Sequence, residues 1–270
     1  MRQDRHATGL PTAADHQPLL FLLPGLGGDQ KLLQNIDQVV HIDYLDWTDL
    51  IHGSGLQTLF THVKSQIEAK LPAGPVHLAG FSIGGPLAYA CALAFQAEGR
   101  RVATMAILDA TASDAPVPVP LNIRLRGRLQ QFASFNLPGG LASIVGKLMA
   151  RPASQPLLRR LQPYRNVELP FGYQKQLHMK ITMQLLMPMF WPWWLELTRS
   201  APPVTAPTYI FRSQDHAPTE PEDLGWSHYC TNVKVIRVPG SHNGMLEPKH
   251  NGPLSANLLN LAGIPNPASR

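Results

Sequence analysis

The feature that most constrains the fold is Gly80-Phe81-Ser82-Ile83-Gly84, which lies between an apolar run at 76–79 and an alanine-rich stretch at 86–96. This order predicts a strand, a sharp turn with Ser82 at its apex, and a helix. Small residues are needed two positions before and two after the serine, because such a turn brings the backbones of strand and helix close together. Ser82 is therefore predicted to project its hydroxyl from the turn as a candidate nucleophile.

Strand and helix signals alternate along much of the chain. Several of the strand signals are continuous apolar or β-branched runs, of the kind that parallel sheets bury on both faces. The predicted strands are 18–23, 39–45, 75–79, 102–108, 208–211 and 233–238, and the predicted helices are 56–71 and 86–96. This alternation predicts an α/β protein with a mostly parallel, doubly wound sheet.

Residues 115–206 interrupt the alternation, because they contain prolines, glycines and short amphipathic patterns but no clear strand. We predict that they form a helical lid inserted into the core. Between residues 117 and 200, eleven basic and two acidic residues give a net charge of +9, whereas the other 12 basic and 16 acidic residues give −4. The excess positive charge indicates either attraction of an acidic partner or anionic surface, or simply a solvated helical face.

The bulk composition predicts one folded domain over residues 1–270, with 1–17 as a disordered polar lead-in. Two cysteines, Cys91 and Cys230, are too few for a disulfide framework, which fits a reducing compartment. The apolar stretch 181–195 is broken by two prolines and is too short to span a bilayer. We therefore expect no transmembrane segment and a soluble cytoplasmic protein.

A serine nucleophile needs a base within hydrogen-bond reach, and that base must be oriented by a carboxylate. In α/β-hydrolase folds the chain order is serine, then acid, then histidine. His242 follows the last predicted strand in a Pro-Gly loop, at the edge where Ser82 is expected. Two aspartates, Asp109 and Asp215, follow predicted strands and could each reach His242, although either could instead cap a helix or turn.

The same chemistry requires backbone N–H groups that face the developing oxyanion. The glycine-rich segment 23–29 follows the first predicted strand and can bring one such amide close. We predict the amides of Leu26 and Ile83 as the two donors. The segment matches neither phosphate-loop nor dinucleotide spacing, so nucleotide binding is not expected, and neither a metal nor an organic cofactor is required.

The stretch 78–109, together with Gly225-Trp226 and 238–246, resembles thioesterase domains of nonribosomal peptide and polyketide synthases. The resemblance implies the α/β-hydrolase fold and covers the sheet and both catalytic edges, but not the lid. In the peptide-synthase branch the acid follows the strand after the elbow helix, which corresponds to Asp109. Discrete editing thioesterases often carry it after the next strand, which corresponds to Asp215, so Asp109 is preferred and Asp215 is kept as the alternative.

The activity that the resemblance implies is release of an acyl or peptidyl chain from a phosphopantetheine thioester, by hydrolysis or by cyclisation. The implied partner is an acyl or peptidyl carrier protein, which would suit the positive lid; no nucleic-acid partner is expected. Met183, Met187 and Trp191 belong to a Met- and Trp-rich part of the lid. They are predicted either to line an apolar acyl channel or to pack in the core.

Two rival functions fit the same residues. A carboxylester hydrolase or lipase would use the same serine, acid and histidine on oxygen esters. An acyl-binding or carrier-docking protein without catalysis would keep the fold but leave Ser82 unreactive towards a fluorophosphonate.

Overall fold

The computed structural model describes residues 17–26, 32–44, 55–112, 186–187 and 189–266. Within this part of the chain, six strands form one parallel sheet in the order β2-β1-β3-β4-β5-β6. The strands are β1 (Leu20–Leu23), β2 (Val39–His41), β3 (Val76–Phe81), β4 (Val102–Leu108), β5 (Thr208–Arg212) and β6 (Val233–Arg237). All the carboxyl ends of these strands therefore meet at one edge of the sheet.

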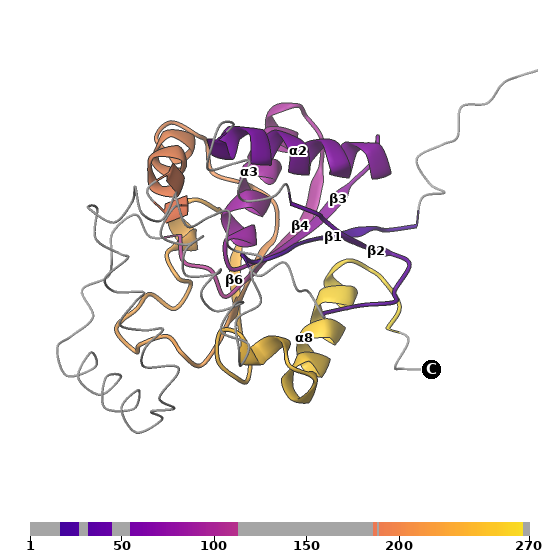
Figure 1. Ribbon diagram of the computed structural model, residues 1–270, viewed down its shortest axis with the longest axis vertical. Coiled ribbons are helices and arrows are strands. Elements are labelled where there is room, and N and C mark those ends of the chain that lie inside the picture. Colours follow the sequence, from indigo (N-terminus) through magenta and orange to yellow (C-terminus); the bar gives the residue numbers. More distant parts are fainter. Residues whose placement is uncertain (1–16, 27–31, 45–54, 113–185, 188, 267–270) are drawn as a thin grey trace, which may run out of the picture.

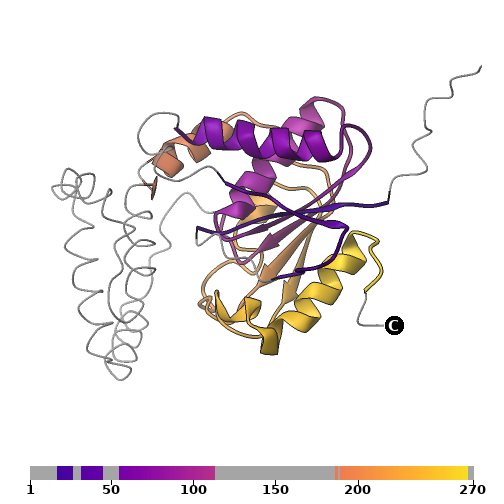
Figure 2. The ribbon, with the colours of Figure 1, turned by 45° about the vertical axis from the view of Figure 1, so that its right-hand side comes forward.

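Helices cover both faces of the sheet (Figures 1 and 2). On one face lie α2 (Gly55–Lys70) and α3 (Gly84–Ala97), and on the other lies α8 (Pro248–Leu261). Two short 3-10 helices also occur: η5 (Trp226–His228) lies between β5 and β6, and η6 (Gly244–Leu246) lies between β6 and α8. The predicted doubly wound α/β sheet is confirmed.

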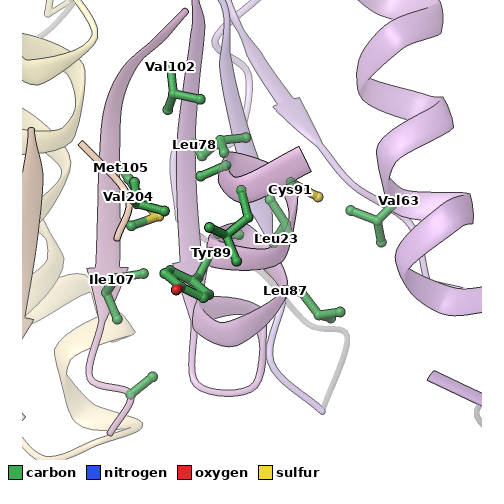
Figure 3. Close-up of a cluster of buried hydrophobic side chains, with 14 of the residues drawn as sticks. Leu23, Val63, Leu78, Leu87, Tyr89, Cys91, Val102, Met105, Ile107 and Val204 are labelled. Carbon is green, nitrogen blue, oxygen red and sulfur yellow. The ribbon is translucent and has the colours of Figure 1, made fainter. Parts of the chain in front are cut away.

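Alternation along the strands builds two cores. In β1, Phe21 and Leu23 pack with α2 and α3, whereas Leu20 and Leu22 pack with α8. The larger cluster joins side chains of α2 and α3 to the sheet (Figure 3). Because successive strand side chains point to opposite faces, a continuous apolar run such as 20–23 is buried on both sides.

The strand positions agree with those predicted, and the differences lie at the ends. β3 extends through Phe81, two residues beyond the predicted end, so the turn begins directly at Ser82. β2 ends at His41, before the predicted end at residue 45, and residue 45 itself lies outside the described residues. The chain leaves the sheet there because the Gln66 side chain bonds the backbone of Asp43, its Oε1 accepting from the amide and its Nε2 donating to the carbonyl.

Most of the predicted lid and all but residue 17 of the predicted lead-in lie outside the described residues, so both stay predictions. Within the lid range, residues 186–187 and 189–198 are helical. Trp194 is 1% exposed, and its ring lies 5.4 Å from Tyr89 of α3 and 5.8 Å from Trp226 between centroids. This end of the segment is thus packed into the core on the α3 face of the sheet.

A substitution at Trp226 tests whether this aromatic cluster stabilises the chain just after β4. Its indole Nε1 donates to the Ala110 carbonyl at 2.6 Å, and the side chain is fully buried. Trp226→Phe is expected to lower the free energy of unfolding by about 1–3 kcal/mol, because the buried carbonyl loses its donor. Urea denaturation measures this, with Trp191→Phe as the control at a 36% exposed site. Equal losses in the two variants would contradict the assignment.

Candidate functional site

Ser82 lies at the tip of a strained turn between β3 and α3. Its φ is 55°, in the left-handed region that residues other than glycine rarely adopt. Its amide donates to the Leu108 carbonyl at 3.0 Å. The hydrogen bond ties the turn to the end of β4. A serine in this conformation is the arrangement that the sequence predicts for a nucleophile.

Two glycines make this turn sterically possible. A Cβ on Gly80 would lie 2.1 Å from the Gly84 carbonyl oxygen, and one on Gly84 would lie 2.5 Å from the Leu23 carbonyl oxygen. The first contact shows that β3 and α3 approach too closely for a side chain. The second shows that the start of α3 also touches the end of β1, so both close approaches depend on the absence of Cβ atoms.

Asp109 directly follows β4 and is buried, with 4% of its surface exposed. It also has a positive φ of 55°, and its amide donates to the Phe211 carbonyl at 2.9 Å. Its Oδ1 accepts a hydrogen bond of 2.6 Å from the Ser213 amide, just past β5. The carboxylate is therefore held between the ends of two neighbouring strands.

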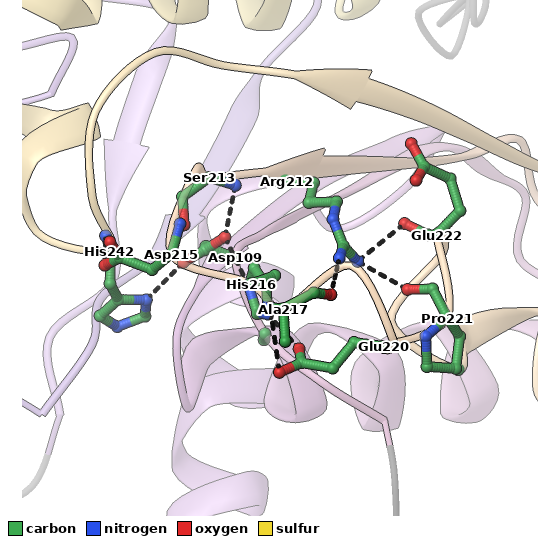
Figure 4. A network of polar contacts seen from close by, with 12 residues as sticks. Asp109, Arg212, Ser213, Asp215, His216, Ala217, Glu220, Pro221, Glu222 and His242 are labelled. Carbon is green, nitrogen blue, oxygen red and sulfur yellow. Dashed lines mark hydrogen bonds and ion pairs between the residues drawn. The ribbon is translucent and has the colours of Figure 1, made fainter. Parts of the chain in front are cut away.

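His242 lies in the loop between β6 and η6, where its imidazole meets Asp109 (Figure 4). Its Nδ1 lies 2.7 Å from Asp109 Oδ2, and its ring stacks on Phe81 with 4.8 Å between centroids. An Nδ1–H that donates to the carboxylate leaves Nε2 with a lone pair, which is the tautomer a general base requires.

The two candidate acids contact different parts of His242. Asp109 meets the ring, whereas Asp215 Oδ2 accepts a hydrogen bond of 2.7 Å from the His242 amide. Asp215 thus orients the backbone of the loop that carries the imidazole. Among the described residues the Ser82 hydroxyl makes no hydrogen bond to His242. Such bonds are often long before substrate binds.

Burial would by itself raise the pKa of the Asp109 carboxyl. Hydrogen bonds from His216, His242 and the Ser213 amide outweigh that effect and hold the pKa well below its ordinary value. Asp109 is therefore an anion throughout the neutral range.

His216 is a contact of Asp109 that the sequence did not reveal. Its Nε2 lies 2.9 Å from Asp109 Oδ1, and its Nδ1 lies 2.6 Å from Glu220 Oε2 (Figure 4). The hydrogen bond to Asp109, helped by the one to Glu220, raises the pKa of His216 against the lowering effect of burial. Its place just after β5 was visible in the sequence, but nothing there distinguished it from a surface histidine.

One predicted oxyanion donor directly follows Ser82, and the other lies in the loop after β1. Ile83 is buried and occupies the N-cap position of α3, where amides have no partner within the helix. Leu26 comes one residue after Gly25, at which an added Cβ would lie 3.3 Å from Ser82 Cβ. Tyr44 supports this loop, because its hydroxyl donates to the Pro24 carbonyl at 2.7 Å.

The predicted substrate-binding residues are only partly described. Met183 lies outside the described residues, and Met187 is half-buried against the larger core cluster. Trp191 is 36% exposed, with its ring 5.4 Å from Phe190. Among the described residues, Met187 and Trp191 form no hydrogen bond or ring contact with Ser82 or His242.

Two kinds of feature are absent from the described residues. In this part of the chain, no helix is both long enough and apolar enough to cross a membrane. The same residues contain no group of three or more histidine, cysteine, aspartate or glutamate side chains arranged to hold a metal ion.

Comparison with known sequences identifies a related domain over the first four strands of the sheet. Residues 20–120 match the family model described as "Thioesterase domain", a stretch that contains Ser82 and Asp109 but not His242. Polyketide synthase 1 of Metarhizium brunneum and of Metarhizium anisopliae are each 31% identical over 123 residues. That match covers 43% of this chain but 5% of each synthase. The chain therefore corresponds to a small part of these relatives.

Solved structures share the fold over most of the chain. A Vlm2 thioesterase domain bound with a dodecadepsipeptide is 17% identical, with a TM-score of 0.57, covering 93% of this chain and 94% of that one. The NocB thioesterase domain, in covalent complex with a fluorophosphonate nocardicin G analogue, is 15% identical, with a TM-score of 0.56 and coverages of 91% and 95%. At these identities the likeness shows the fold alone. Together the comparisons confirm that the chain resembles synthase thioesterase domains.

Gly80→Ala tests the steric basis of the turn. The added methyl would meet the Gly84 backbone, and such overpacking is expected to cost about 3 kcal/mol of unfolding free energy. The control is Gly99→Ala, where the methyl meets nothing within 4 Å and only the φ of +73° is unfavourable, at roughly 1 kcal/mol. Urea denaturation compares the two variants. A loss at Gly80 no larger than at Gly99 would rule out the close approach.

The raised pKa of His216 predicts a pH-dependent contribution to stability. A group whose pKa is raised on folding stabilises the protein fully below its unfolded pKa, about 6.5 for histidine, and this contribution is lost as pH rises through the folded pKa. The difference in unfolding free energy between wild type and His216→Gln should therefore be largest near pH 6 and shrink towards pH 9. Urea titrations at several pH values measure it, and a difference that grows with pH would show the opposite sign.

Proposed function

We propose that this chain is a serine thioesterase that releases an acyl or peptidyl group from a phosphopantetheine thioester. The observation that carries the proposal is the contact of 2.7 Å between His242 Nδ1 and Asp109 Oδ2, at the sheet edge where Ser82 occupies its strained turn. The thioesterase family match over residues 20–120 supports the thioester as the bond that is cleaved.

In the proposed first step, His242 Nε2 takes the proton of the Ser82 hydroxyl while the oxygen attacks the thioester carbonyl carbon. The carbonyl oxygen becomes an anion and accepts hydrogen bonds from the Leu26 and Ile83 amides. Asp109 accepts from His242 Nδ1 and so stabilises the imidazolium that forms. When the C–S bond breaks, the proton on Nε2 passes to the departing thiolate and leaves an acyl-serine.

In the second step a nucleophile resolves the acyl-serine. Water gives hydrolysis, and a hydroxyl or amine of the chain itself gives cyclisation. In either case His242 removes the proton of the nucleophile and later returns it to the Ser82 oxygen, so the enzyme is regenerated without a metal or an organic cofactor.

The proposed donor of the acyl chain is a carrier protein. The relatives of known sequence are synthases, and one solved structure that shares the fold is a four-domain nonribosomal peptide synthetase. The sequence also supports this partner, because an acidic carrier protein would suit the +9 net charge of residues 117–200.

Between the two aspartates, we propose Asp109 as the acid. Its carboxylate faces the ring nitrogen whose proton it must hold, whereas Asp215 accepts from the backbone amide of the same residue. Loss of the Asp109 charge would therefore affect the tautomer and charge of the base directly. Loss of the Asp215 charge would affect only the support of its loop.

The test measures kcat on one acyl N-acetylcysteamine thioester, a small mimic of phosphopantetheine. Ser82→Ala should abolish turnover and fluorophosphonate labelling, and Asp109→Asn should lower kcat by about 10³- to 10⁴-fold. Asp215→Asn should lose less than about tenfold. Asp223→Asn is the matched control, because its carboxylate accepts from Gly225 and Ser227 of its own turn, away from His242.

Four results would overturn the proposal. Full activity of Asp109→Asn would show that Asp109 is not the acid. Full activity of Ser82→Ala would show that Ser82 is not the nucleophile. Faster turnover of the matched oxygen ester than of the thioester would instead favour a carboxylester hydrolase. Unmodified wild-type protein after fluorophosphonate treatment would favour a binding protein without catalysis.

A further inference from the structure

His216 lies between two carboxylates, one of which contacts His242. Its ring nitrogens lie 2.9 Å from Asp109 Oδ1 and 2.6 Å from Glu220 Oε2, and its side chain is 14% exposed. The side chain of Asp109 is 1% exposed. These contacts place Glu220, His216, Asp109 and His242 in one continuous line of hydrogen bonds (Figure 4).

The protonation state of His216 follows from its two partners. An ionised carboxylate can only accept hydrogen bonds, and a neutral imidazole has only one N–H to donate. A neutral His216 would therefore direct a lone pair at one carboxylate oxygen. Only the imidazolium, which donates from both nitrogens, satisfies both contacts, and Glu220 favours this charged form.

The charges around His216 still allow Asp109 to stabilise an imidazolium at His242. Among the described residues, the charged or titratable groups that face the line are Asp109 after β4, Glu220 and Asp215 in the loop after β5, and His242 after β6. The buried Arg212 guanidinium donates to the carbonyls of that loop, at Ala217, Pro221 and Glu222. Glu220, His216 and Asp109 together carry a charge of −1, so Glu220 offsets the cation and the line still attracts an imidazolium at His242.

We propose that His216, held as an imidazolium by its contacts with Asp109 and Glu220, is a positioning residue that fixes the Asp109 carboxylate for His242. With His216 and the Ser213 amide on Oδ1, and His242 on Oδ2, the carboxylate cannot rotate without losing hydrogen bonds. The proposal rests on the proposed function of His242 as the base.

The charge of His216 gives the positioning role a signature in the pH profile. Once pH rises through the raised pKa of His216, the neutral ring has one N–H and can no longer donate to both carboxylates, so wild-type kcat should fall. His216→Gln and His216→Ala carry no titrating group at this position and should lack that fall. A residue that only supported the fold would lower activity without changing this part of the profile.

The experiment compares His216→Gln and His216→Ala with His228→Gln, a matched control on the exposed η5 histidine. Both His216 variants should lack the fall of kcat that the wild type shows as pH rises through the pKa of His216. His216→Ala should lower kcat about tenfold with little change in KM, since one hydrogen bond to a charged group is lost. His216→Gln, whose amide can still donate to Asp109, should retain more of the kcat.

A second measurement does not depend on turnover. Titration of the His216 ring by NMR should give a midpoint above 6.5 in the wild type, and Glu220→Gln should lower that midpoint by about one pH unit. A wild-type midpoint at or below 6.5 would overturn the imidazolium. A fall of kcat at high pH that persists in both His216 variants would overturn the positioning role, as would wild-type kcat in both.

The two proposals fail in different ways. If wild type neither hydrolyses the thioester nor reacts with a fluorophosphonate, the proposed function is wrong, and the NMR titration still decides whether His216 is charged. If wild type is active and His216 titrates as neutral, the proposed function stands and this inference is wrong.

Discussion

The buried carboxylate of Asp109 is the interaction on which the rest of the site depends. It accepts hydrogen bonds from the Ser213 amide, His216 and His242, which come from segments more than a hundred residues further along the chain. An unpaired carboxylate at 4% exposure would be strongly unfavourable, so these segments must be in place for the folded state to tolerate the charge. Folding of the sheet edge and assembly of the candidate site are therefore the same event.

The sequence could predict the sheet because its signals are local. Continuous apolar runs at 20–23 and 102–108 identify strands buried on both faces, and the glycines around Ser82 identify the turn from sterics alone. Strand ends were less accurate, because they depend on tertiary contacts. The Gln66 side chain that ends β2 comes from a helix 23 residues away and leaves no mark in the strand itself.

The candidate site could be predicted where chain order and strand ends determine it. The contacts that depend on loop geometry could not. Ser82, Asp109, Asp215 and His242 all follow strands, and a parallel sheet brings those ends to one edge. Which aspartate meets which atom of His242 depends on loop geometry that residue spacing does not encode. His216 was missed for the same reason, since its contact with Asp109 requires the loop after β5 to fold back over the end of β4.

Arg212 explains how that loop is held in place. Its buried guanidinium, at the end of β5, donates to three carbonyl oxygens of the segment 217–222 and has no carboxylate partner among the described residues. Because one rigid cation fixes these carbonyls, Glu220 is held where it can meet His216. The Arg212 cation at the strand end thus holds the shape of the loop. The loop in turn places the His216 side chain against Asp109.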